Sequence, residues 1–129
     1  MIRGIPLVSL NNRFKIMMKP IFVGREDEIL PFQSKKIVLK KGAVNLEGFI
    51  INVKGKFFGY VNRCSHISLA LDWGDNDFFS EDKKFLLCKN HGALYDPKTG
   101  TCVAGPCAGD SLERLSLKIE KGNIYCSLL

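Results

Sequence analysis

Residues 64–66 read Cys-Ser-His and residues 88–92 read Cys-Lys-Asn-His-Gly, and these two short segments decide the fold. The chain has only two histidines, and each follows a cysteine by two or three positions. The spacings C-x-H and C-x-x-H therefore use every imidazole in the protein. Thiolate and neutral imidazole are ligands of borderline and soft metals, so the pattern predicts a metal centre held by Cys64, His66, Cys88 and His91.

Two kinds of metal centre fit this ligand set. The first is a tetrahedral zinc ion bound by two cysteines and two histidines. The second is a 2Fe-2S cluster with both thiolates on one iron and both imidazoles on the other. Gly92 directly follows the second pair and can take a positive φ, which would let the chain turn sharply around either centre.

The residues that follow extend the pattern. Ala93-Leu94-Tyr95-Asp96 comes next, then Thr99-Gly100, then Cys102, and then Gly105-Pro106. In this order the segments resemble the Rieske 2Fe-2S ferredoxin family, over roughly residues 20–129. The resemblance implies one 2Fe-2S cluster per chain, with Cys64 and Cys88 on the inner iron and His66 and His91 on the outer, more exposed iron. The spacer from Trp73 to Asp82 is longer than in compact members and is expected to form an extra loop.

The same resemblance implies roles for four residues around the cluster. Tyr95 is expected to donate a hydrogen bond to a cluster sulfur, which would tune the reduction potential. Pro106 is expected to cover the cluster, with simple turn formation as the alternative. Trp73 either shields the cluster or packs against the spacer loop, and we favour packing. Gly92 completes the set as the turn residue.

Length and composition favour one all-β domain. The chain has 129 residues, of which 46% are hydrophobic, with many short Val/Ile/Phe runs between glycines and prolines. The resemblance specifies a Rieske-type antiparallel β-sandwich over residues 18–129, with a small cluster-binding subdomain at about 62–108. We expect residues 1–17 to be a disordered extension or an over-long start assignment, with a membrane anchor as the less favoured alternative.

Strands are expected where short apolar runs alternate with turn residues. Lys54-Gly55 and Lys121-Gly122 are predicted to be two-residue hairpin turns. The expected strands are Ile21–Val23, Ser34–Leu39, Phe49–Val53, Lys56–Val61, Phe85–Leu87, Leu94–Asp96, Leu115–Glu120 and Asn123–Ser127.

Three cysteines remain outside the ligand set. Cys102 and Cys107 are neighbours in sequence near the Gly-Pro loop, and we expect two reduced, partly buried thiols, as is usual in the cytosol. Cys126 is expected to be a core residue. High-potential respiratory Rieske proteins join their two ligand loops by a disulfide, but the corresponding positions here are Leu69 and Asn90, so that bridge is ruled out.

Charge and hydropathy limit the location and the partners. The net charge of +6 favours an acidic redox partner, with ordinary solvated lysines as the equally weighted alternative. No basic run alternates with aromatic residues, so nucleic-acid binding is not expected. The first 17 residues lack the apolar segment of a secretory signal, and no stretch is long enough to cross a bilayer, so a cytoplasmic protein is expected.

The ligand count excludes a self-contained oxygenase. Rieske oxygenases need a second iron bound by two further histidines, and this chain has none to spare. The sequence therefore predicts an electron-transfer protein and not an enzyme: a ferredoxin that receives single electrons from a reductase and passes them to a partner oxygenase or reductase. Two alternatives remain open, namely the small subunit of a nitrite-reductase-like complex and an interaction module with a structural zinc ion.

Overall fold

The structure is a computed structural model that describes residues 20–41, 43–65 and 69–128. Within these residues it forms antiparallel β-strands and one turn of 3-10 helix. The expectation for residues 1–17 falls outside the described part of the chain. The elements are β1 Ile21–Arg25, η1 Glu26–Glu28, β2 Ser34–Lys41, β3 Val44–Val53, β4 Lys56–Val61, β5 Leu86–Leu87, β6 Leu94–Tyr95, β7 Cys102–Ala104, β8 Arg114–Glu120 and β9 Asn123–Leu128.

The larger sheet is built from tight hairpins. Its strand order is β1-β9-β8-β4-β3-β2. The turn between β3 and β4 places Lys54 at φ 53° and Gly55 at φ 90°, and the β8–β9 turn places Lys121 at φ 52° and Gly122 at φ 81°. Two consecutive positive φ values match the twist of the flanking strands, which confirms both predicted hairpin turns.

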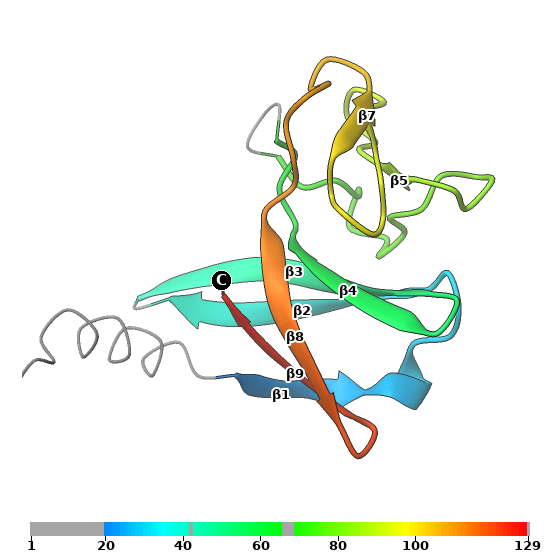
Figure 1. Ribbon diagram of the computed structural model, residues 1–129. Helices are drawn as coiled ribbons and strands as arrows, with labels where there is room; N and C mark the ends of the chain where they lie inside the picture. Colours follow the sequence, from blue (N-terminus) through cyan, green and yellow to red (C-terminus); the bar gives the residue numbers. More distant parts are fainter. Residues whose placement is uncertain (1–19, 42, 66–68, 129) are drawn as a thin grey trace, which may run out of the picture.

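The smaller sheet, β5-β6-β7, stands at one end of the larger one. Figure 1 shows this part of the chain lying beyond the point where β4 leads out of the large sheet and where β8 returns to it. Contacts between the larger sheet and the loops of the smaller one include a ring stack and a hydrogen bond. Phe49 of β3 stacks on Phe78 of the spacer loop with ring centroids 3.9 Å apart, and the Tyr60 hydroxyl of β4 donates to the Pro97 carbonyl at 2.8 Å.

Two clusters of buried side chains form the core. One lies within the larger sheet and includes Ile50, Ile124 and Cys126, which confirms the expectation that Cys126 is buried. The other spans both sheets and contains Cys64 and Cys88. Because the second cluster is apolar and continuous, the two ligand cysteines are held by packing as well as by their loops.

The predicted antiparallel β architecture is confirmed, and the two largest differences in the strands concern β3 and β7. Strand β3 begins at Val44, five residues before the predicted start at Phe49. No predicted strand corresponds to β7, which has three residues and pairs with β6 through a register shift. A strand this short has too few positions for an alternating pattern to be visible.

Candidate metal centre

The first ligand loop continues directly from β4. After Val61 the chain turns through Asn62 and Arg63 to reach Cys64. The Cys64 N–H donates to the Leu69 carbonyl at 2.7 Å, which closes the loop around the segment that contains the predicted ligand His66. Residues 66–68 lie outside the described residues, so the position of His66 stays a prediction.

The second ligand loop follows β5 and is tighter. The Cys88 N–H donates to the Ala93 carbonyl at 2.9 Å, and the Gly92 N–H donates back to the Cys88 carbonyl at 2.8 Å. Gly92 has φ 74°, which confirms its predicted turn conformation. His91 is thereby presented at the exposed tip of the loop, while Cys88 points into the core.

The two ligand loops bring the sulfur atoms of Cys64 and Cys88 together. Their residues are 3% and 0% exposed, and the two thiols interact directly. Burial raises the pKa of the Cys88 thiol and the Cys64 thiol raises it further, whereas the backbone N–H groups of Asn90 and His91 lower it. Two adjacent buried sulfurs with backbone N–H groups directed at one of them form a suitable half-site for a thiophilic metal.

Tyr95 lies where the sequence predicts a sulfur partner. Its hydroxyl oxygen is 3.1 Å from Cys64 Sγ and 3.3 Å from Cys107 Sγ. Ser65 provides two more contacts, since its N–H donates to the Tyr95 oxygen at 3.2 Å and its hydroxyl lies 3.1 Å away. The phenol therefore links the first ligand loop to the loop that follows β7.

That third loop carries the Gly-Pro pair and packs closely against the second ligand loop. Gly105 has φ 99°, and a β-carbon there would come within 2.9 Å of the Cα of Ala93. Only glycine avoids both the strain and the clash. Pro106 is exposed on the same loop.

The expected redox state of the third-loop cysteines is wrong. Cys102 and Cys107 form a disulfide with their Cα atoms 5.9 Å apart, and the other cysteines, Cys64, Cys88 and Cys126, are not in a disulfide within the described residues. The prediction of thiols followed from the usual reducing compartment and took no account of the loop geometry. The loop folds back after β7, which brings the two side chains to bonding distance.

The prediction for Trp73 is also wrong. Its residue is 72% exposed, so it does not pack within the spacer loop. The indole instead lies near the ammonium group of Lys89, whose nitrogen is 5.8 Å from the ring centroid. Lys89 also pairs with the carboxylates of Asp75 and Asp77, so Trp73 lies at a polar, exposed part of the loop, whereas the aromatic packing of the loop comes from Phe78 and Phe79.

A buried carboxylate that the sequence analysis did not single out ties the first ligand loop to the large sheet. The Asp72 side chain is 0% exposed and accepts from Lys36 Nζ of β2 at 2.8 Å, Asn62 Nδ2 at 3.1 Å and the Asn76 N–H at 2.9 Å. Burial alone would raise the pKa of Asp72, but these hydrogen bonds outweigh it and lower the pKa. No sequence signal marks this residue, because Lys36 is far away in the chain.

A further hydrogen bond connects the two ligand loops. The Lys89 N–H donates to the Leu71 carbonyl at 2.8 Å, and the Leu71 N–H donates to Asn62 Oδ1 at 2.9 Å. Both loops are therefore connected by hydrogen bonds to the residue that follows β4. This coupling would keep ligands from the two loops in a fixed relative position.

The donor set fits a cluster with two sulfur and two nitrogen ligands only when both loops are considered. Among the described residues no group of three or more metal-binding side chains converges, and one predicted ligand, His66, lies outside them. The described part supplies two buried sulfurs and an exposed histidine on the second loop. Buried thiolates on one side and solvent-facing imidazole on the other match the asymmetric ligation of a 2Fe-2S centre with histidine on one iron.

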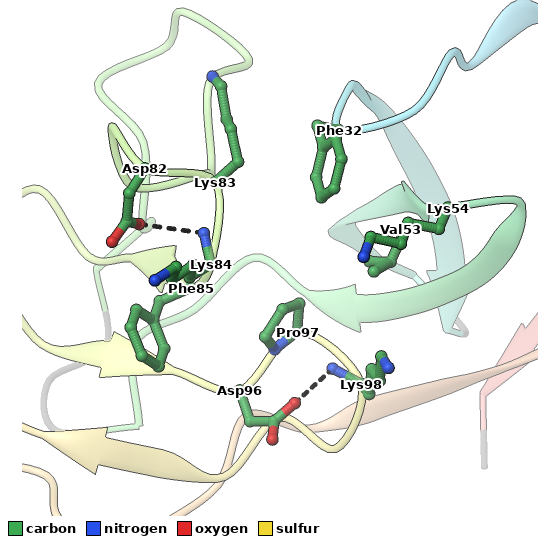
Figure 2. Close-up of a pocket in the computed structure, with 10 residues that line it drawn as sticks. All are labelled: Phe32, Val53, Lys54, Asp82, Lys83, Lys84, Phe85, Asp96, Pro97 and Lys98. Carbon is green, nitrogen blue, oxygen red and sulfur yellow. Dashed lines mark hydrogen bonds between the residues drawn. The ribbon is translucent and has the colours of Figure 1, made fainter.

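A separate pocket of about 650 Å³ lies between the β3–β4 turn and the loops of the smaller sheet. Figure 2 shows lysines and aspartates arranged around apolar side chains. The pocket is lined by Phe32, Val53, Lys54, Asp82, Lys83, Lys84, Phe85, Asp96, Pro97 and Lys98. None of its four lysines forms an ion pair with a carboxylate within the described residues. The lining has neither cysteine nor histidine, so this pocket is distinct from the metal centre.

The fold and the two ligand loops define a class, namely an antiparallel β domain that grips a metal centre from two loops at one end. The Rieske [2Fe-2S] domain family matches residues 19–126. The chain belongs to this family. Its cofactor is therefore a 2Fe-2S cluster, and the chain is an electron-transfer protein. This identification replaces the zinc alternative.

Curated relatives of the chain are ferredoxin subunits. It is 32% identical over 79 residues to the 3-phenylpropionate/cinnamic acid dioxygenase ferredoxin subunit of Shigella flexneri serotype 5b (strain 8401), over 61% of this chain and 70% of the relative. The protein of the same name from Escherichia coli (strain K12) is equally similar, with the same coverage.

Solved structures share the fold. The ferredoxin of carbazole 1,9a-dioxygenase from Nocardioides aromaticivorans IC177 superimposes with a TM-score of 0.66 at 20% identity, over 86% of this chain and 99% of the ferredoxin. A chain from the complex of reduced oxygenase and oxidised ferredoxin in carbazole 1,9a-dioxygenase gives a TM-score of 0.65 at 21% identity, over 84% of this chain and 92% of the other.

No helix in the described part of the chain is long and apolar enough to span a membrane.

Proposed function

We propose that this chain is the ferredoxin component of an oxygenase system and carries single electrons from a reductase to a terminal oxygenase. The observation that carries the proposal is the asymmetry of the site, where Cys64 and Cys88 are 3% and 0% exposed while His91 is exposed. An electron carrier needs an insulated redox centre with one face open to its partners. The ferredoxin subunits among its relatives support the same role.

We infer that the ligands are Cys64 and Cys88 from the core side and His66 and His91 from the solvent side. When bound, the cluster supplies a centre that gains and loses one electron. The protein's part is to hold that centre with little rearrangement. Burial of both sulfurs excludes water from the core side of the centre. The hydrogen bond from the Lys89 N–H to the Leu71 carbonyl holds the two ligand loops in a fixed relative position.

Tyr95 and Asn90 adjust the charge on the two sulfurs. The Tyr95 hydroxyl is 3.1 Å from Cys64 Sγ, and Asn90 Nδ2 is 3.8 Å from Cys88 Sγ. Hydrogen bonds donated to ligand sulfurs stabilise the electron-rich state of the centre and raise its potential. We propose Tyr95 as the main such donor, because its contact is the shorter and is buried.

We also propose that residues 18–129 form the Rieske domain and that about 62–108 form its cluster-binding part, which the β5-β6-β7 sheet and its loops support. The lysines around the pocket of Figure 2, which form no ion pair within the described part of the chain, would favour an acidic partner surface. A cytoplasmic location would suit this role and can be tested by cell fractionation.

Reoxidation kinetics test the proposal. The cluster-loaded chain, reduced with dithionite and freed of excess reductant under anaerobic conditions, is mixed with the oxygenase purified from the same source. We expect the visible absorption of the oxidised chain to return with second-order kinetics, and the chain to migrate alone in gel filtration. Purification of the chain as a stable stoichiometric subunit of a large reductase would contradict the proposal and favour the nitrite-reductase-like alternative.

A further inference from the structure

The Cys102–Cys107 disulfide lies within the core that surrounds the ligand sulfurs. The two residues are 3% and 1% exposed and belong to the same buried cluster as Cys64, Cys88 and Tyr95. Cys102 begins β7, and Cys107 follows Pro106 on the loop that packs against the second ligand loop. A second sulfur pair therefore lies next to the metal centre, and the proposed electron-transfer role does not account for it.

The disulfide is not the only constraint on its loop. The Cys102 N–H donates to the Asp110 carbonyl at 2.8 Å, and the Asp110 N–H donates to the Cys107 carbonyl at 2.8 Å. The bond also joins residues only five positions apart, and closing so short a loop removes little chain entropy from the unfolded state. Loop closure by itself is therefore a weak reason for this bond.

Tyr95 connects the disulfide to the proposed ligand Cys64. Its oxygen is 3.1 Å from Cys64 Sγ and 3.3 Å from Cys107 Sγ. A phenol has one proton to donate, so it can serve only one of these sulfurs fully. In the disulfide Cys107 has no proton and is a weak, neutral acceptor, whereas a ligand thiolate is a strong one. Of the acceptors within reach of the Tyr95 proton, which also include the neutral Ser65 hydroxyl at 3.1 Å, a ligand thiolate at Cys64 is the strongest, so the proton is directed at Cys64.

We propose that Cys102 and Cys107 form a second redox site, whose state is transmitted through Tyr95 to the cluster ligand Cys64. A dithiol reductant breaks the S–S bond and supplies two electrons and two protons. The products are two protein thiols and the disulfide of the reductant. This inference rests on the proposed function in one respect, because it takes Cys64 as a cluster ligand.

Reduction changes what Cys107 can do. Its new S–H group faces the Tyr95 oxygen and donates to it, which makes the Tyr95 O–H a better donor to Cys64 Sγ. A stronger hydrogen bond to a ligand sulfur stabilises the reduced cluster. The dithiol form of the chain therefore has the higher midpoint potential and retains its electron more strongly.

Thiol labelling tests whether the second site exists, independently of any cluster. The air-exposed full-length chain is denatured in iodoacetamide, with or without earlier treatment with dithiothreitol, and weighed by mass spectrometry. With two of the five cysteines in the disulfide and three outside it, we expect three labels before treatment and five after it. Five labels in the untreated chain would overturn the proposal.

Protein-film voltammetry tests the coupling in the cluster-loaded chain. We expect dithiothreitol to raise the midpoint potential of the wild type. Cys102→Ser leaves Cys107 as a permanent thiol, so it should already have the raised potential and should not respond to dithiothreitol. Cys126→Ala, in the other core cluster, should respond as the wild type does.

Tyr95→Phe separates coupling through the phenol from a general effect of loop loosening. The variant keeps the disulfide and the packing of the ring but lacks the hydroxyl, so dithiothreitol should leave its potential unchanged. No upward shift in the wild type, or an equal shift in Tyr95→Phe, would overturn the proposal. A chain that takes up no 2Fe-2S cluster would instead overturn the proposed function, while the label count would still report on the disulfide.

Discussion

Replacement of Asp72 by alanine is expected to speed the loss of the cluster, because this carboxylate anchors the first ligand loop to the large sheet. Its side chain is 0% exposed and pairs with Lys36 Nζ at 2.8 Å, with further bonds from Asn62 and the Asn76 N–H. Breaking a buried ion pair costs roughly 3–5 kcal/mol. Lys36 is 26% exposed and can regain solvent, so the lower figure of about 3 kcal/mol applies.

The assay is the rate at which visible absorption is lost in moderate guanidinium chloride. Loss of a cluster is irreversible, so a rate and not an equilibrium measures stability here. If the anchor is broken in the transition state for unfolding, about 3 kcal/mol corresponds to bleaching roughly 100-fold faster than in the wild type.

Asp75→Ala is the matched control. Asp75 also pairs with a lysine of this region, Lys89, but its side chain is 46% exposed. An exposed pair contributes about 1 kcal/mol or less, so bleaching should be at most about fivefold faster. Equal rates for the Asp72 and Asp75 variants would refute the anchoring role.

Three further predictions concern single residues. Tyr95→Phe should lower the midpoint potential by roughly 60 mV, the one-electron equivalent of losing about 1.4 kcal/mol of hydrogen bonding to Cys64, and an unchanged potential would contradict this. Burial raises the pKa of the Cys126 thiol to about 12, so the folded state keeps the thiol protonated at pH values where the unfolded state ionises. The free energy of unfolding of the wild type should therefore fall as pH rises above about 9, by up to about 1.4 kcal/mol per pH unit more than that of Cys126→Ala. Parallel pH profiles of unfolding for the two proteins would exclude this. Gly105→Ala should lower the free energy of unfolding by roughly 1–2 kcal/mol more than Gly109→Ala does, as measured by thermal or denaturant unfolding. Both glycines have φ near 98°, but only a β-carbon at Gly105 would clash with Ala93. Equal losses in the two variants would disprove the close approach.

The strands and turns that local sequence controls were predictable. Lys54-Gly55 and Lys121-Gly122 have the residues that two-residue hairpins need, and the flanking apolar runs fix β4 at its predicted bounds, Lys56–Val61. The turn at Gly92 was predictable for the same reason. These features depend on a few neighbouring residues, so no knowledge of distant contacts was needed.

Features that depend on distant contacts were missed or wrongly predicted. Asp72 is buried with Lys36, which reaches it from another strand, and Trp73 is exposed with its ring against Lys89 of the second ligand loop. The disulfide between Cys102 and Cys107 depends on how the loop folds back after β7, and their spacing alone does not reveal that path.

The central claim is that two cysteines and two histidines hold one 2Fe-2S cluster. Pulsed electron paramagnetic resonance of the dithionite-reduced chain, grown with ¹⁵N-labelled histidine, tests it most directly. The account predicts hyperfine coupling to two histidine nitrogens, with one lost in His91→Cys. A paramagnetic cluster without histidine coupling, or a colourless chain that binds zinc in place of iron, would contradict it.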